Sequence, residues 1–502
     1  MHKHTKFAAA TIALVAGVIV IPPCVFLVTV WMRDGNTPLT DAPVGTNDAS
    51  RLNENKPAEV VEIAPDAAAA EAQLSALVRR AAAQGSHISI SGARHSMGGH
   101  TIYPGAIVLD MLPFNRMSLD ESARLLTVGA GARWSEIIPF LDHRGFSVSI
   151  MQSNNDFTVG GSLSVNCHGW QNNSPPIASS VESFRLLTPS GNIVRCSRSE
   201  NTELFSMVLG GYGLFGVMLE VELRVVPNEY YIAEPHRVGP EDYNRVYHEL
   251  TVNNPEVGMA YGRISVAPDA FMNECIITLL KRTKYDTPVI DTLAAGKALL
   301  LKRLVFRAGV ESGYGKNLRW WLEKRMGETG NSPTSRNQIM NEPSVEYATR
   351  DPKTTDILHE YFIPVERLAE FVEKSRPVFL RYHPELLNIT VRNVEPDSDS
   401  FMKYARTEVF GLVLLFHQRR TPEGEDAMQR LTRDLIDVAE SCGGRYYLPY
   451  RAHATEEQFL QAYPQARNFV ERKNFYDPSG VFENEFYLKY GKPLEQPLPI
   501  TR

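Results

Sequence analysis

The sequence of 502 residues has few cysteines and no excess of basic residues. Its five cysteines are scattered and contain no C-x-x-C pair, which excludes a disulfide framework and leaves no zinc site. The net charge is -6, and no lysine or arginine run is longer than a pair. This balance argues against a nucleic-acid partner, which normally requires a basic face. The length exceeds one ordinary domain, and about three domains are expected.

The N-terminal stretch from Phe7 to Met32 lacks charged residues and exceeds the roughly 20 apolar residues that span a bilayer. We therefore predict a single-pass transmembrane anchor in residues 1–32 and a polar linker over 33–56. Lys3 and Lys6 precede the stretch, so the positive-inside rule places the body on the periplasmic or outer side. A cleaved secretory signal is the alternative.

Three turns rich in glycine follow in the first part of the body. They are Ser91 to His100, Thr158 to Gly169 and Gly210 to Gly216. Glycine lets backbone N–H groups approach an anion, and serine and threonine add donors. None is a Walker loop, so a P-loop nucleotide site is not supported. Three such turns in order predict a site for a cofactor that carries phosphate.

The first turn also contains His95. A phosphate site has no need of an imidazole, so this histidine indicates either covalent chemistry or a role in proton transfer. A solvated turn with an incidental histidine is the alternative.

Strand and helix patterns alternate between residues 230 and 445. This alternation favours an antiparallel sheet that covers one face of the first domain. Polar residues on these segments and just after them are candidates to face a substrate: Arg263, Arg392, His417, Tyr450, Arg451 and His453. An arginine on an alternating strand can equally lie on a solvated face.

The segment from Leu293 to Gly327 mixes apolar runs with basic residues and with Trp320 and Trp321. The basic residues are Lys297, Lys302, Arg303, Arg307, Lys316, Arg319, Lys324 and Arg325. Basic residues and tryptophan on helices are typical of a segment that lies on anionic lipid. The alternative is a pair of amphipathic helices that packs on the sheet.

Four stretches together resemble the vanillyl-alcohol oxidase / p-cresol methylhydroxylase (PCMH) family. They are GARHS at Gly92 to Ser96, TVGGSLSVNCHG at Thr158 to Gly169, GGYGLFGVM at Gly210 to Met218, and NFYDPSGVFENEFY at Asn474 to Tyr487. Within the family the sequence is most similar to the branch of aldonolactone oxidases, alditol oxidase and decaprenylphosphoryl-ribose oxidase.

The resemblance implies an α+β fold: a two-subdomain PCMH-type FAD-binding domain (57–229) and an antiparallel-sheet substrate cap (230–445). A C-terminal segment (446–502) would return to the FAD domain, and the N-terminal transmembrane helix would precede them.

The resemblance also implies that FAD is bound, with His95 as the point of covalent attachment. If His95 were only a hydrogen-bonding partner of non-covalent FAD, the sequence would look the same. The implied cofactor-binding residues are Ser91, Gly92, Ala93, Arg94, His95, Ser96, Met97, Ser153, Thr158, Gly160, Gly161, Ser164, His168, Val217 and Tyr447. The expected catalytic residues are His168, Tyr450, His453 and Arg392, with Tyr450 or His453 as the base. Cys167 is interpreted as a small buried thiol rather than a second flavin attachment.

The expected activity is oxidation of a CH–OH group of a sugar, aldonolactone or polyol-like small molecule, with hydride transfer to flavin N5. The electron acceptor is oxygen, quinone or cytochrome, and the sequence does not distinguish them. Thr390 stands where alditol oxidases carry a glutamate, and Tyr450 where decaprenylphosphoryl-ribose oxidase carries a lysine. The substrate therefore stays open. A lipid-linked sugar, or a membrane-tethered binding or structural protein on a flavin-domain scaffold, are the alternatives.

Overall fold

The first part of the body is built on a small parallel sheet. The computed structural model describes residues 17, 21–34, 42–284, 293, 299–329 and 332–495. Strands β1 (Glu59–Glu62), β3 (Ile107–Asp110) and β2 (Ile88–Ser91) pair in that order, and α2 (Ala67–Gln84) packs on them. The Asp66 side chain caps the start of α2, and Gly85, in the left-handed conformation, ends it. The chain leaves β2 directly into the first glycine-rich turn.

A second, antiparallel sheet carries the other two turns. Its strand order is β4-β5-β9-β7-β8, with β6 paired to β9. The elements are β4 (Met117–Asp120), β5 (Leu125–Gly129), α3 (Trp134–Asp142), β6 (Phe146–Val148), α4 (Val159–Ser164), η1 (Ile177–Ser180), β7 (Val181–Leu187), β8 (Ile193–Ser197), α5 (Thr202–Val208) and β9 (Val217–Pro227). The second glycine-rich turn forms α4, and the third lies between α5 and β9.

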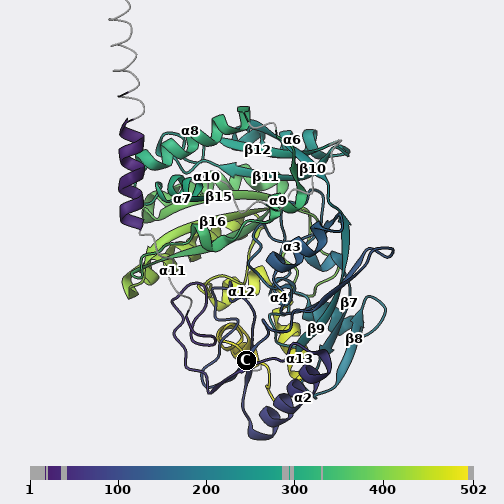
Figure 1. The fold of residues 1–502 in the computed structure, drawn as a ribbon. Coiled ribbons are helices and arrows are strands. Elements are labelled where there is room, and N and C mark those ends of the chain that lie inside the picture. Colours follow the sequence, from purple (N-terminus) through teal and green to yellow (C-terminus); the bar gives the residue numbers. More distant parts are fainter. Residues whose placement is uncertain are drawn as a thin grey trace, which may run out of the picture.

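The cap is an eight-stranded antiparallel sheet of order β13-β10-β12-β11-β15-β16-β14-β17 (Figure 1). Its strands are β10 (Tyr230–Val238), β11 (Val257–Ile264), β12 (Cys275–Thr283), β13 (Thr334–Ser335), β14 (Thr354–Pro364), β15 (Glu385–Val394), β16 (Val409–Arg419) and β17 (Arg445–Tyr446). Its helices are α6 (Pro240–Thr251), η2 (Pro268–Ala270), α7 (Leu299–Arg307), α8 (Gly313–Thr329), α9 (Arg336–Met340), η3 (Ser344–Tyr347), η4 (Val365–Arg367), α10 (Leu368–Tyr382) and α11 (Pro422–Ser441). Helix α10 packs against both α6 and α11.

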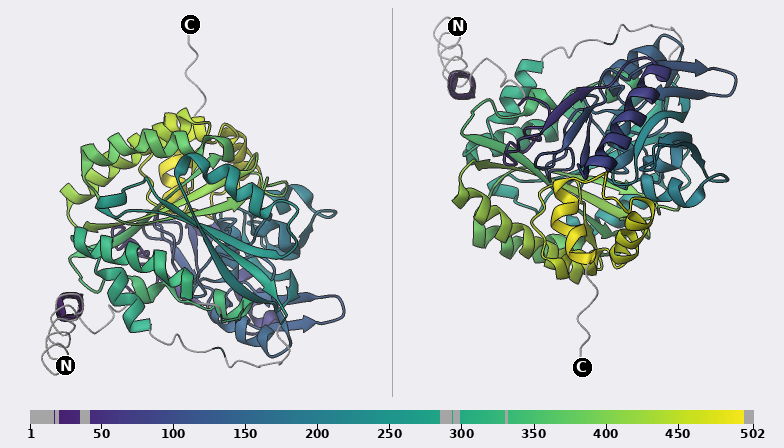
Figure 2. Two further views of the ribbon diagram at one scale, coloured as in Figure 1. Left: turned by 90° about the horizontal axis from the view of Figure 1, so that it is seen from above. Right: turned by 90° about the horizontal axis from the view of Figure 1, so that it is seen from below.

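The C-terminal segment returns to the first sheet. It contains α12 (Glu456–Ala462), α13 (Ala466–Tyr476), a π-turn (Tyr487–Gly491) and a 3-10 turn (Lys492–Glu495), which lie beside α11 and the N-terminal strands (Figure 2). Phe482 bridges to Ile88 of β2. The buried Asp477 carboxylate accepts hydrogen bonds from Lys473 and from the backbone N–H groups of Val481 and Phe482. The DPSGVF sequence thus forms a turn that closes the fold through its aspartate.

The predicted mixture of helices with antiparallel sheets is confirmed. Residues 21–34 form a helix beside the body, and most of the rest of the predicted membrane anchor lies outside the described residues. Among the residues that the structure describes, no helix combines the length and the apolar character needed to cross a bilayer.

Candidate active site

A cavity of about 860 Å³ lies between the first domain and the cap. All three glycine-rich turns line it from one side, and residues of β14, β15 and β16 line it from the other. Its volume is in the range of sites for large organic ligands. The predicted residues Gly92 to Met97, Ser153, Thr158, Gly160, Gly161, Ser164, His168 and Tyr447 all line it, whereas Ser91 and Val217 do not.

The first two turns are packed so closely that they require glycine. A Cβ atom on Gly92 would lie 2.3 Å from Oγ1 of Thr158, and one on Gly160 would lie 3.0 Å from the carbonyl oxygen of Ala130. Thr158 in turn caps α4, with its Oγ1 accepting a hydrogen bond from the Gly161 N–H at 3.3 Å. Glycine is therefore required at both positions, and both glycines line the cavity.

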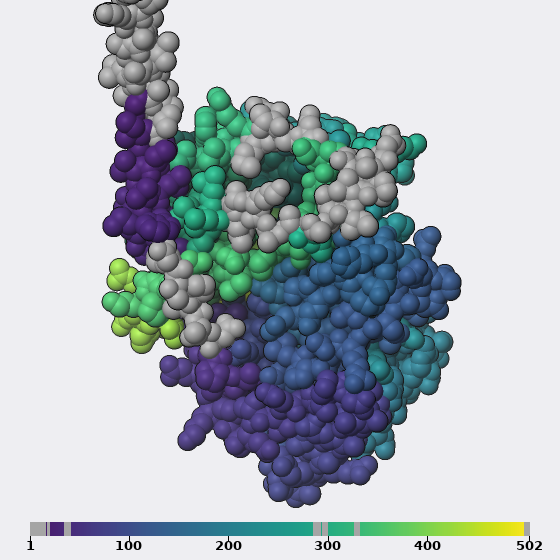
Figure 3. All heavy atoms as spheres, in the orientation of Figure 1, coloured from purple at the N-terminus to yellow at the C-terminus, as the bar shows by residue number. Residues whose placement is uncertain are grey.

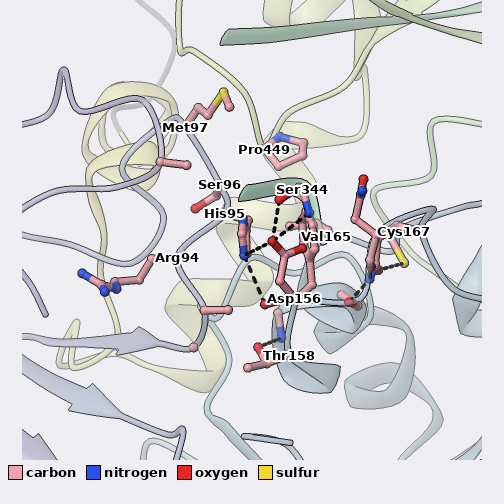
Figure 4. A pocket seen from close by; sticks show the side chains of 18 of the residues that line it. Arg94, His95, Ser96, Met97, Asp156, Thr158, Val165, Cys167, Ser344 and Pro449 are labelled. Carbon is pink, nitrogen blue, oxygen red and sulfur yellow. Dashed lines mark hydrogen bonds and ion pairs between the residues drawn. The ribbon is translucent and has the colours of Figure 1, made fainter. Parts of the chain in front are cut away.

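His95 lies on the cavity wall (Figure 4). Its ring stacks on Phe157 with centroids 4.1 Å apart. Its Nε2 is 3.1 Å from the carbonyl oxygen of Asp156 and 3.8 Å from the carboxylate Oδ2 of the same residue. The Asp156 carboxylate accepts hydrogen bonds from the N–H and the hydroxyl of Ser344. This arrangement fixes the ring plane, and Nδ1 has no hydrogen-bond partner among the described residues.

Several buried polar atoms of the cavity wall have no partner within the described protein. They are Oγ of Ser96, Oγ1 of Thr101, Nδ1 of His168 and Nε of Arg392. Unpaired buried polar atoms are costly, so their presence around one cavity fits a ligand with many polar groups. Together with the bare glycine backbone, these atoms fit the phosphate, ribityl and ring groups of FAD.

A buried carboxylate faces the cavity from the cap. Glu360 of β14 pairs with His168. The distance between Nε2 of His168 and Oε1 of Glu360 is 2.5 Å, and both side chains are almost fully buried. The hydroxyl of Tyr450 donates to the other oxygen of Glu360 at 3.3 Å. Gly411 on the adjacent strand keeps this space open, because a Cβ there would lie 3.2 Å from both Glu360 and His168. His168, Glu360 and Tyr450 thus form a polar cluster at one end of the cavity.

Burial, followed by the negative charge of Glu360, raises the pKa of Tyr450 well above its ordinary value. The phenol is therefore protonated at neutral pH, and in this cluster Tyr450 is a hydrogen-bond donor to Glu360.

Arg392 of β15 joins the same end of the cavity. Its guanidinium donates to Oγ of Ser153 at 2.9 Å and to the carbonyl oxygen of His168 at 3.4 Å. Tyr447 donates to the carbonyl oxygen of Val165 at 2.7 Å, which ties the C-terminal segment to the second turn. The structure thus brings Arg392, His168, Ser153 and Tyr447 together around one cavity, although they come from separate parts of the chain.

His453 lies elsewhere. Its Nε2 is 2.8 Å from Oε1 of Glu425 and its Nδ1 is 2.9 Å from Oγ1 of Thr432, and it does not line the cavity. Because both ring nitrogens are engaged away from the cavity, the geometry assigns it no contact with a substrate.

Three other candidates from the sequence are engaged in ion pairs. Arg451 pairs with Glu425, Arg263 with Glu323, and His417 with Asp356. None of the three lines the cavity.

Glu360 was not among the sequence candidates. It lies inside the strand pattern DILHEYFIP, and the signal that could have identified it is an acidic residue within an otherwise apolar strand. Cys167 lines the cavity, and burial raises the pKa of its thiol to about 12. The thiol is therefore neutral and a poor nucleophile. Among the described residues, no group of histidine, cysteine or carboxylate side chains could hold a metal ion.

Comparison with known proteins agrees with the site. Residues 66–197 match the family described as FAD binding domain. The chain is 23% identical to decaprenylphosphoryl-beta-D-ribose oxidase of Mycolicibacterium smegmatis over 453 residues, which cover 83% of this chain and 91% of that protein. It is 30% identical to L-gulonolactone oxidase of Bos taurus over 29% of this chain and 33% of that protein. An uncharacterized oxidoreductase of the fasciation locus of Rhodococcoides fascians is 32% identical over 31% of this chain and 35% of that protein.

The last two similarities span about a third of each relative. The cofactor of the matched domain is FAD. Residues 66–197 therefore form an FAD-binding domain of the PCMH type, and the chain is similar to oxidases and dehydrogenases that carry such a domain.

Proposed function

We propose that the chain oxidises a CH–OH group of a sugar, aldonolactone or polyol-like substrate at the end of the cavity formed by His168, Glu360, Tyr450 and Arg392. The observation that carries this proposal is the buried Glu360 carboxylate, which faces the cavity from the cap and is oriented by His168 and Tyr450. Bound FAD would supply the hydride acceptor, at its N5.

Each residue of the cluster has a distinct part in this chemistry. Glu360 accepts the proton of the substrate hydroxyl as the C–H bond loses its hydride, so that a carbonyl is left. His168 holds the carboxylate in position through the contact at 2.5 Å. Tyr450, kept protonated by burial, donates a hydrogen bond to Glu360. Arg392 is placed to bind a substrate oxygen, since its Nε is buried without a partner.

We also propose that His95 attaches FAD covalently. The support is the orientation of the ring, whose Nε2 faces Asp156 and whose Nδ1 is left as the available nitrogen. A histidyl bond prevents loss of the flavin and raises its potential. Attachment at Nδ1 predicts that a peptide containing His95 carries flavin mass after proteolysis.

The substrate class rests on the relatives and on the cap. The relatives include oxidases and dehydrogenases named for a decaprenylphosphoryl ribose, gulonolactone and galactonolactone. On β15 this chain has Thr390 and retains Arg392, and the buried carboxylate next to His168 comes from a different strand, at Glu360. A sugar linked to a lipid is the second candidate, because the ribose oxidase is aligned over most of the chain.

The proposed location is a membrane, with a single-pass anchor and the body on the periplasmic or outer side. The support is the uncharged stretch from Phe7 to Met32 behind Lys3 and Lys6. The proposed electron acceptor is oxygen, quinone or cytochrome.

Anaerobic reduction of the bound flavin by a panel of aldonolactones, alditols and lipid-linked sugars tests the proposed function. Bleaching of the flavin absorbance by one class identifies it, and Glu360→Gln should slow that bleaching. A flavin that no member of the panel bleaches would contradict the proposal.

A further inference from the structure

The helix over residues 21–34 is docked on the cap beside α7 and α8 (Figures 1 and 3). Val30 is buried in this contact, and the ring of Phe26 meets Tyr314 of α8 edge to face, with centroids 5.2 Å apart. The guanidinium of Arg33 donates to the carbonyl oxygens of Val310 and Arg307, both at 3.2 Å. The helix therefore has a fixed seat on the body.

A buried ion-pair network holds the end of this helix. Asp34 pairs with Arg303 and with Arg307, and all three side chains are at most 7% exposed. Arg307 also pairs with Asp356, which lines the cavity. Separating such buried pairs leaves uncompensated charges, which makes the docked position strongly preferred.

Arg303 connects the same network to the cavity rim. It donates to the carbonyl oxygens of Glu346 and Ala348, and Ala348 lines the cavity. The orientation of the N-terminal helix is therefore coupled to the rim of the cavity.

The outer face of the helix is apolar and uncovered. Ile21, Val25, Val28 and Met32 follow one another at spacings of four, three and four, so they form a single stripe, and each is more than half exposed. This stripe is continuous in sequence with residues 7–20, which contain no charged residue. Apolar side chains in such a stripe are stabilised when they leave water.

The adjoining cap helices add further exposed apolar residues. On α7 they are Leu300 and Leu301, and on α8 they are Tyr314 and Trp321, which are seven positions apart and so share a helix face. Arg325 lies over the Trp321 ring at 4.6 Å. Tryptophan, tyrosine and arginine in this arrangement are typical of the boundary between headgroups and hydrocarbon.

The basic residues of this segment are largely engaged within the protein. Lys302 pairs with Glu342, Lys316 with Glu385, and Lys324 with Glu274. Of the two interpretations of this segment, a surface for anionic lipid or a helix pair packed on the sheet, these ion pairs agree with the second. The apolar side chains are therefore the part of this face that is available to a partner.

We propose that this face, formed by the stripe on residues 21–32 and by Leu300, Leu301, Tyr314 and Trp321, is seated on a lipid bilayer. The uncharged stretch before residue 21 favours lipid over a second copy of the chain. The docked helix then acts as a rigid bracket and not as a loose tether: it holds α8 against the membrane surface and fixes the direction in which the cavity faces. This inference rests on the proposed membrane location and is independent of the proposed chemistry.

The test uses the full chain in nanodiscs of neutral phosphatidylcholine, with either brominated or ordinary acyl chains. In a Cys24→Ser background, single cysteines replace Val28, Trp321 or Phe475, and each is labelled with a small fluorophore. Phe475 is the matched control, because it is an exposed aromatic residue on α13, at the other end of the body. We expect brominated chains to quench the labels at positions 28 and 321 and to leave the label at 475 unchanged.

A second set of variants separates the bracket from a loose tether. Phe26→Asn with Arg33→Gln and Asp34→Asn removes the ring contact, the Arg33 hydrogen bonds and the Asp34 ion pairs from the helix side. Arg303 and Arg307 keep their partners within the body. We expect these changes to abolish quenching at position 321 and to retain it at position 28. Quenching at 28 alone in the parent protein would overturn the bracket. A label at 28 shielded from both lipid and aqueous quenchers would indicate a second copy and would also overturn it. Flavin content, measured on each variant, reports separately on the proposed function.

Discussion

Replacing Glu360 by glutamine removes the proton acceptor and nearly preserves the shape of the site. The glutamine side chain can keep contacts with both His168 and Tyr450, so the fold and the flavin content should not change. The Glu360 side chain is only 1% exposed, so bulk water cannot take over the proton. The change therefore isolates the proton transfer from the packing.

The expected loss follows from the usual contribution of a positioned base. General-base catalysis contributes about 10²- to 10⁴-fold, which corresponds to about 3–5 kcal/mol in the barrier. Tyr450→Phe should cost less, because its hydrogen bond to the Glu360 carboxylate is long, at 3.3 Å, and a weak hydrogen bond to a charged group is worth about 1.5 kcal/mol, or roughly tenfold. The order of the two effects is part of the prediction.

The assay is the rate of flavin reduction in anaerobic stopped flow, with the substrate identified by the panel. Glu408→Gln is the control, because Glu408 is also paired with a histidine, His248, at 2.9 Å but does not line the cavity. A Glu360→Gln rate within threefold of the parent, at equal flavin content, would refute the assignment of Glu360 as the base.

Four further changes have expected outcomes. His95→Ala should leave flavin that separates from the chain on acid precipitation, and flavin that still co-migrates would exclude attachment there. Gly92→Val should lower the flavin-to-protein absorbance ratio severalfold, because the new side chain would collide with Thr158. An unchanged ratio would contradict the role of the first two glycine-rich turns in binding FAD. Cys167→Ser should keep flavin and activity, and in the native protein this thiol should resist thiol reagents at neutral pH, since burial raises its pKa to about 12; rapid labelling would contradict this. Burial alone would raise the pKa of Glu425, but its partners His453 and Arg451 have the larger combined effect and lower the pKa to about 2. Its contribution to stability is therefore present above pH ~4.5 and lost as the pH falls toward 2, so the difference in Tm between the parent and Glu425→Gln should shrink over that window; a constant difference would contradict the pairing.

The FAD-binding domain could be predicted because its binding residues lie in short continuous turns of the sequence. The turn at Gly92 packs so closely on Thr158 that only glycine fits there, and such positions are visible in the sequence as glycines. The cap could be predicted only as a sheet. Which strand residues face the cavity depends on register, and one step of register exchanges the two faces.

The two clearest differences between the sequence predictions and the structure both arise from contacts between residues that are far apart in the sequence. Glu360 contacts His168, and His453 is engaged by Glu425, and neither pairing is visible from local patterns. The basic segment is similar, because Lys302 looks available in sequence and meets Glu342 only in the folded cap.

The spectrum of the purified full chain, recorded before and after anaerobic addition of substrate, shows whether the chain holds a flavin and whether that flavin oxidises a CH–OH group. We expect about one flavin per chain, retained after denaturation, and bleached by a sugar, an aldonolactone, a polyol or a lipid-linked sugar. A colourless protein obtained from cells with ample riboflavin would contradict it.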